Sequence, residues 1–243
     1  MTRYLTSTFS TALLAAALLA PAPSASACAG CGCSTAEAPS AAATGHKHQG
    51  EHKHDHAHGD EHSGSNSTAA ASVGEAAPAF RLMDQSGEPV ALSDFAGQPV
   101  VVEFFNDQCP FVKKFYENGD MNRLAEQAAD EYGAAWIAID ASSFSNVDEN
   151  AAIAEEWGIE RPLLDGSAGD VGQQFGAKTT PHMYVIDGEG TLVYAGAIDS
   201  EASTDSDDIA GATNYVMQAL AELKDGTAIS TPETKAYGCS VKY

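Results

Sequence analysis

The sequence predicts an α/β domain in which a mixed β-sheet carries helices on both faces and a β-hairpin extends the N-terminal side. Short apolar segments of strand composition alternate with segments of helical periodicity along most of the chain. A closing hairpin around Asp187-Gly188-Glu189-Gly190 is followed by a last helix. This alternation is typical of a sheet with parallel strands whose connecting helices pack on both sides.

The predicted elements follow one another in chain order. They are a hairpin of residues 78–82 and 90–92, a turn or short helix at 93–97, a central strand at 100–105, a helix from Pro110 to about Asp130 interrupted at Asn118-Gly119, a strand at 134–140, a helix at 146–157, a short strand or loop at 162–165, helical turns at 170–175, a hairpin of 182–186 and 192–195, a helix at 209–224 and an irregular segment at 225–243.

Cys109 stands between the central strand and the helix that follows it. The strand is a continuous β-branched and aromatic run, and Pro110 fits the first helical turn because its missing N–H would be unpaired there. At such a position the helix dipole and free backbone N–H groups stabilise a thiolate. The other interpretation is a small buried hydrophobic residue, as free cysteines often are. The arrangement of strand, turn, Cys-Pro and helix favours a reactive thiol.

This stretch resembles the thioredoxin superfamily. Thr180-Pro181 before a strand, the closing hairpin and the terminal PETKAYGCSVKY make residues 72–243 similar to AhpC/TSA-type redoxin-like proteins with an N-x-x-C-P-x-V motif. The resemblance implies a thioredoxin-like fold, thiol redox chemistry, and a cis-proline loop at Thr180-Pro181. It also implies that Pro110, Thr180 and Pro181 line the substrate site, while His182 reads as a packed or loop histidine.

The resemblance also implies a proton relay through Glu103, which lies in the apolar strand, where a carboxylate is costly unless it is paired or titrates. The alternative places Glu103 in solvent at the strand end. A thioredoxin-type second cysteine would stand at Val112, so a dithiol at this turn is excluded. The family resemblance offers Cys239 as resolving thiol, against an isolated thiol on a frayed terminus; Cys31 or Cys33 is a weaker candidate.

Three functions are compatible with these residues. The first is thiol–disulfide exchange with protein thiols or disulfides, supported by a separate reductant partner and requiring no cofactor. The second is a thiol peroxidase, although Val102 and Asn106 replace the proline and threonine of the related peroxidase motif; Asn106 and Arg161 would then have to orient the peroxide. The third is a non-enzymatic metal-binding protein on a redoxin scaffold.

Residues 1–27 have the features of a secretory signal, with an apolar core too short to span a bilayer and a cleavage site at Ala25-Ser26-Ala27. We therefore expect a periplasmic or secreted protein. In the alternative, Ala25-Ser26-Ala27-Cys28 is a degenerate lipobox and Cys28 carries a lipid anchor. No other segment is predicted to cross a membrane.

Residues 28–71 are predicted to be a disordered Cys/His-rich segment, because they lack the apolar content of a core. Thiolates and imidazoles at this density could bind Zn, Cu or Ni, or the segment could be a solvated linker. The candidate metal ligands are Cys28, Cys31, Cys33, His46, His48, His52, His54, His56, His58 and His62.

The chain of 243 residues leaves room for one domain at 72–227 and a C-terminal tail at 228–243 that carries Cys239. Its formal net charge of −22 argues against nucleic acid and anionic membranes as partners. An odd number of cysteines, 5, points to a reactive or metal-bound thiol in addition to any disulfide.

Overall fold

The computed structural model of the protein describes residues 70–243. The predicted leader and every cysteine and histidine named as a metal ligand lie outside the described residues. Within residues 70–243, no helix combines the length and apolar character needed to cross a membrane.

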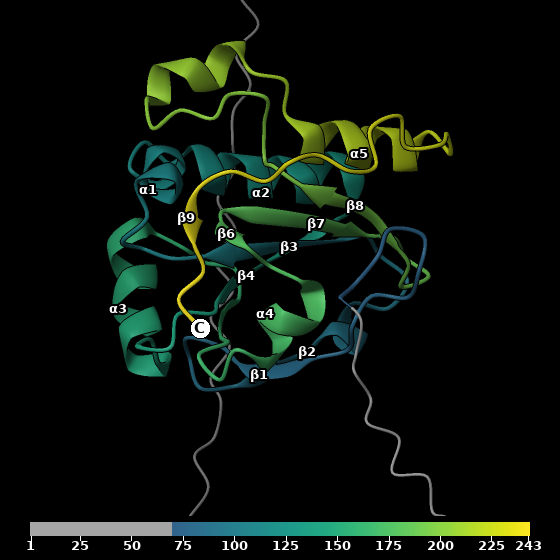
Figure 1. Ribbon diagram of the computed structural model, residues 1–243. Helices are drawn as coiled ribbons and strands as arrows, with labels where there is room; N and C mark the ends of the chain where they lie inside the picture. The colour runs from purple at the N-terminus through teal and green to yellow at the C-terminus, as the bar shows by residue number, and fades with distance from the viewer. Residues whose placement is uncertain (1–69) are drawn as a thin grey trace, which may run out of the picture. The chain divides into compact units, whose positions relative to one another are not determined.

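A five-stranded sheet forms the centre of the described domain, in the order β5-β4-β3-β7-β8 (Figure 1). The strands are β3 (Val100–Phe105), β4 (Ala135–Asp140), β5 (Leu163–Asp165), β7 (His182–Ile186) and β8 (Leu192–Gly196). Strands β3, β4 and β5 run parallel, whereas β7 is antiparallel to both β3 and β8. Every residue of β3 is buried, which explains its continuous apolar sequence, since a central strand is covered on both faces.

The two faces of the sheet pack against different elements. Val101 and Phe105 face a core built with α1 (Pro110–Tyr116), α2 (Asp120–Tyr132), α3 (Val147–Trp157) and α5 (Tyr215–Lys224). Val102 and Phe104 face a second core with α4 (Asp170–Phe175) and the hairpin of β1 (Arg81–Met83) and β2 (Pro89–Ala91). Figure 1 shows α1, α2 and α5 on one side of the sheet and α4, β1 and β2 on the other. The predicted mixed sheet, its two helical layers and the N-terminal hairpin are confirmed.

The structure also confirms the smaller elements around the central strand. Residues Leu92–Phe95 form the short 3-10 helix η1 before β3. Gly119, with a φ of 70°, separates α1 from α2 at the predicted interruption. Gly158 ends α3 in the left-handed conformation that glycine adopts without a Cβ penalty.

The prediction of one helix over residues 209–224 is wrong at its start. Ser206–Gly211 form a separate 3-10 helix, η2, and α5 begins only at Tyr215. The side chain of Asn214 accepts a hydrogen bond from the Met217 N–H and thereby caps α5. Ile209 has the right spacing for the apolar face of a longer helix, but the asparagine cap sets the boundary.

The prediction that residues 225–243 are irregular is also wrong in one place. Cys239–Ser240 form strand β9, which pairs antiparallel with β6 (Thr179–Thr180) so that Thr180 stands opposite Cys239. This short ladder brings the C-terminal tail beside the N-terminal end of α1 (Figure 1). The tail therefore ends in an ordered position next to Cys109.

Candidate active site

Cys109 occupies the junction predicted for it, as the N-cap residue of α1 with Pro110 at the first helical position. The loop before it is held by Asn106. Its backbone carbonyl accepts the Cys109 N–H at 3.1 Å, and its side-chain oxygen accepts the Gln108 N–H at 2.7 Å. Its amide also donates to Ser142 Oγ at 2.8 Å. These bonds fix the sulfur at the end of β3, where Cys109 is only 1% exposed.

Thr180 contacts Cys109 from a distant part of the sequence. The Cys109 thiol donates to the Thr180 carbonyl at 2.9 Å, across 71 residues of sequence. The Thr180–Pro181 peptide bond is cis, as predicted. The Thr180 side-chain oxygen is buried without a hydrogen-bond partner in the described chain.

Cys239 lies against Cys109 because β9 pairs with β6 on the other side of Thr180. Both thiols are free. The alternative of an isolated Cys239 on a frayed terminus is therefore wrong, whereas its role as resolving thiol stays a prediction. Cys109 is buried, whereas Cys239, which lies against it, is half-buried.

The surroundings shift the pKa values of the two thiols in opposite directions. Burial opposes ionisation of Cys109, but hydrogen bonds to the sulfur from the Cys239 thiol, the Cys239 N–H and the Val112 N–H help to outweigh it, so the pKa of Cys109 lies below the ordinary 9.0. Burial and the neighbouring Cys109 raise the pKa of Cys239 to about 11. Cys109 is thus the more acidic thiol of the pair.

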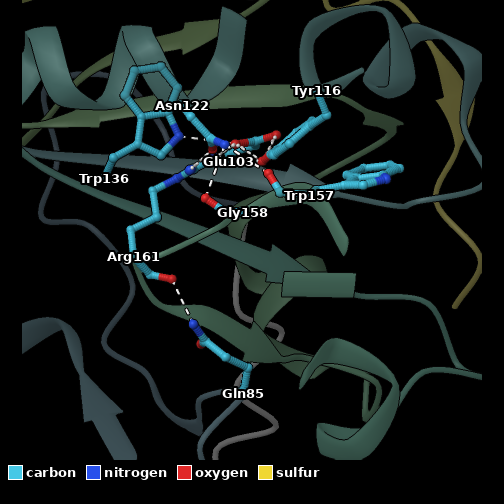
Figure 2. Close-up of polar contacts among 8 residues, drawn as sticks. All are labelled: Gln85, Glu103, Tyr116, Asn122, Trp136, Trp157, Gly158 and Arg161. Carbon is cyan, nitrogen blue, oxygen red and sulfur yellow. Dashed lines mark hydrogen bonds and ion pairs between the residues drawn. The ribbon is translucent and has the colours of Figure 1, made fainter. Parts of the chain in front are cut away.

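Glu103 is fully buried at the centre of a polar cluster, shown in Figure 2. Its carboxylate accepts hydrogen bonds from the Tyr116 hydroxyl and Trp136 Nε1, each at 3.0 Å, and Arg161 Nη2 lies 3.7 Å away. Burial raises the pKa of Glu103, although Arg161 opposes the shift. The alternative that Glu103 points to solvent is wrong.

The proton relay from Glu103 stays a prediction. Within residues 70–243, the hydrogen bonds of Glu103 lead to Tyr116 and Trp136 and not to Cys109. Tyr116 belongs to α1, the helix that Cys109 caps, so the cluster reaches the reactive end of the domain through this helix.

Arg161 lies at the Glu103 cluster and not at Cys109. Its guanidinium donates to the Tyr116 hydroxyl and to Asn122 Oδ1, both at 2.7 Å (Figure 2). The peroxide-orienting role considered for Arg161 therefore has no support in this arrangement. Asn106, the other candidate, has its amide and its carbonyl oxygen engaged in holding the loop.

Sequence reasoning missed a second buried polar group, formed by Lys114, Asp199 and Tyr237. Lys114 Nζ lies 3.8 Å from Asp199 Oδ2 and donates to the Glu201 carbonyl at 3.1 Å. The Tyr237 hydroxyl donates to Asp199 Oδ1. Since Tyr237 lies in the C-terminal tail and Lys114 in α1, these contacts connect the tail to α1. One signal was available: Lys114 stands three residues after Phe111, on the same side of the helix, where a charge next to an apolar side chain requires a partner.

His182 is a packed residue, as predicted. Its ring lies on Tyr184 with centroids 4.6 Å apart, and Nδ1 accepts the Lys178 N–H at 3.3 Å. Burial, with Lys178 nearby, lowers the pKa of His182 to about 4.

No cluster of three potential metal ligands occurs in the part of the chain that the structure describes. The Cys/His-rich candidates lie outside it, so metal binding remains a prediction.

Comparisons with known proteins bear on the family and the fold. The AhpC/TSA family model matches residues 73–195, half of the chain. No curated protein matches the sequence. A hypothetical protein from Sinorhizobium meliloti 1021 is 24% identical over 72% of this chain and 96% of that chain, with a TM-score of 0.61. An uncharacterized conserved protein from Geobacillus kaustophilus is 25% identical over 71% of this chain and 92% of that chain, also at 0.61. Peroxidoxin BcpB from Mycobacterium tuberculosis is 29% identical over 64% of this chain and 97% of that chain, with a TM-score of 0.49.

The matched region contains β3, Cys109 and the cis-proline loop, and the sheet order is that of a thioredoxin-like domain. The chain belongs to the AhpC/TSA family.

Proposed function

We propose that the protein is an exported thioredoxin-like thiol–disulfide oxidoreductase in which Cys109 attacks and Cys239 resolves. One observation carries the proposal. Strand β9 holds Cys239 opposite Thr180, whose carbonyl accepts the Cys109 thiol at 2.9 Å, so two free thiols of opposite acidity lie together. The thiolate of such a pair is the nucleophile and the protonated partner is kept for the second step.

The exchange has two steps. The Cys109 thiolate attacks one sulfur of a substrate disulfide, a mixed disulfide forms, and the second substrate sulfur leaves as a thiolate. Cys239 then attacks the sulfur of Cys109, and its proton passes to the departing substrate thiolate. The substrate gains two electrons and the protein is left with a Cys109–Cys239 disulfide. An external dithiol reductant regenerates the pair.

Peroxide reduction is the second candidate, favoured by the family match and by the burial of Cys109. In that reaction a peroxide oxidises Cys109 to a sulfenic acid, and Cys239 condenses with it to give water and the same disulfide. Asn106 and Arg161 are committed to other contacts, so the site offers neither for peroxide orientation. Disulfide exchange therefore ranks first.

The proposed location rests on the leader at residues 1–27, which would direct the domain to the periplasm or outside the cell, with a Cys28 lipid anchor as the alternative. Because a net charge of −22 repels other anions, we expect neither nucleic acids nor anionic membranes as partners.

Trapping separates the candidate functions. The Cys239→Ser variant cannot resolve a mixed disulfide. When it is mixed with insulin whose disulfides are intact, it should therefore accumulate a covalent adduct at Cys109. Cys109→Ser is the matched control and should form no adduct at this site. Rapid oxidation by hydrogen peroxide without any mixed disulfide would favour the peroxidase. An unchanged phenotype in Cys109→Ser, with loss on deleting residues 46–62, would favour the metal-binding scaffold.

A further inference from the structure

The C-terminal tail lies over the edge of β6, the backbone that flanks Cys109. In this position β9 pairs with Thr179–Thr180, and the Val241 N–H donates to the Lys178 carbonyl at 3.2 Å. The edge of a strand is a common docking place for an extended peptide, because its unpaired N–H and C=O groups add the incoming chain as another strand. Here the protein itself fills that edge.

The residue that fills it is a cysteine. Cys239 stands opposite Thr180 and beside the Cys109 sulfur, which is where a substrate cysteine would have to lie for attack. With the tail in place, Cys109 is only 1% exposed. A protein disulfide cannot reach a sulfur that is this enclosed.

The tail lies on the domain as a surface layer. No residue from Pro232 to Tyr243 is fully buried, in contrast to the strands beneath. Polar contacts attach it: the Tyr237 hydroxyl donates to Asp199, the Lys242 carbonyl accepts the Ser143 N–H at 2.8 Å, and the Tyr243 hydroxyl donates to the Ala177 carbonyl at 2.8 Å. The side chains of Tyr237, Cys239 and Val241 also pack on the outside of the two cores. Lifting the segment from Tyr237 onward would uncover the β6 edge and would remove only partly buried side chains from the outside of the two cores.

We propose that β9 is an internal substitute for the substrate, and that the β6 edge takes an extended, cysteine-bearing segment of a partner protein once the tail has lifted away. The inference rests on the proposed disulfide exchange and adds the partner's shape and binding mode. Return of the tail would then deliver Cys239 to the mixed disulfide and remove the reduced segment from the same edge. Binding and resolution become mutually exclusive states of one strand position.

Gly238 provides the test, because it packs directly on the edge. Its φ is +135°, and a Cβ there would clash with the Thr180 carbonyl oxygen, so Gly238→Ala should push β9 off β6. Gly226→Ala is the matched control: its φ is +65°, but nothing lies within 4 Å of the added Cβ. Tyr237→Phe is a second, milder variant that removes the bond to Asp199 without altering the backbone.

The measurement uses the full chain with Cys28, Cys31, Cys33 and Cys239 replaced by serine, which leaves Cys109 as the single cysteine. Two probes are compared: a small aromatic disulfide, and an extended peptide whose cysteine carries the same aromatic leaving group. Release of the chromophore gives both rates. Their ratio cancels any change in the thiolate fraction of Cys109.

A minor open state limits the rate by its population, so opening the tail should raise the peptide-to-small-disulfide ratio by about tenfold or more in Gly238→Ala. Tyr237→Phe should raise it less, and Gly226→Ala should not change it. A peptide that is N-methylated two residues after its cysteine lacks the donor equivalent to the Val241 N–H. For this peptide, Gly238→Ala should therefore not raise the ratio. An equal ratio in the parent chain and both tail variants, or equal rates for the methylated peptide, would overturn the inference. Failure of Cys109 to react with either disulfide in any variant would instead overturn the proposed function.

Discussion

At the scale of single residues, the reactivity of Cys109 depends on its immediate contacts. Burial at 1% exposure would make a thiol less acidic, and only donors aimed at the sulfur reverse that effect. Two of those donors belong to Cys239. The resolving candidate therefore also activates the attacking one.

Replacing Cys239 by alanine should raise the pKa of Cys109, because the thiol donor from the tail is lost. The thiolate fraction at neutral pH should fall accordingly. The ultraviolet absorbance of the thiolate, titrated in a chain with Cys28, Cys31 and Cys33 replaced by serine, measures this. Ser240→Ala is the control on the same strand. An unshifted titration in Cys239→Ala would mean that the tail does not activate Cys109.

His182 makes the folded domain sensitive to acid. Its pKa is lowered to about 4 from 6.5, so between these values the unfolded chain binds the proton more readily. The contribution of neutral His182 to the free energy of unfolding is complete above pH 6.5 and is lost as the pH falls toward 4. Across that window the folded state should lose about 3 kcal/mol through this residue.

His182→Gln should be free of this loss. Urea unfolding of the variant and the parent at several pH values measures the difference, and the two stability curves should converge as the pH falls. Parallel curves over the whole range would show that His182 titrates normally in the folded state.

At the scale of elements, local sequence patterns predicted most of the sheet. The run from Val100 to Phe105 identified β3 because a central strand is apolar on both faces, and Pro110 identified the start of α1. Strand β9 escaped prediction because two residues, Cys239 and Ser240, carry no periodicity. Its pairing with Thr179–Thr180 is a contact between distant parts of the chain.

In the site, too, local features could be predicted whereas contacts between distant residues could not. The position of Cys109 follows from a short motif, whereas the cis Thr180–Pro181 bond was implied only by the family resemblance. The partners of Glu103 come from three separate elements or loops, since Tyr116 is in α1, Trp136 in β4 and Arg161 before β5. A single sequence shows that a buried carboxylate needs partners, but not which ones.

The Glu103 cluster should matter for stability. Arg161→Met leaves the carboxylate buried without its cation, and breaking such a pair costs about 3–5 kcal/mol. Because burial already raises the pKa of Glu103, the loss should be small near pH 4.5 and should grow as the pH rises and the carboxylate ionises. Urea unfolding at acidic and neutral pH measures this.

Two further variants control that experiment. Glu103→Gln combined with Arg161→Met should recover part of the loss, because no charge is then left buried. Arg123→Met removes an exposed arginine paired with Asp120 and should cost at most about 1 kcal/mol. Equal losses in Arg123→Met and Arg161→Met would contradict a special role for the cluster.

At the scale of the whole molecule, the −22 net charge acts on whatever approaches Cys109. A negative field raises the local concentration of cations and repels anions, and salt screens both effects. A cationic disulfide should therefore react with the protein about tenfold faster than an anionic disulfide of the same size at low ionic strength. The ratio should fall toward one at high salt. A ratio that ignores salt would mean that local contacts govern access.

The pairing of Cys109 with Cys239 is the claim on which the rest depends. Peptide mapping of the wild-type protein, oxidised with a small disulfide and digested without reduction, tests it most directly. We predict one dominant linkage, between the peptide containing Cys109 and the peptide containing Cys239. Linkage of Cys109 to Cys31 or Cys33, or a Cys109 that stays reduced while Cys239 is modified, would contradict the account.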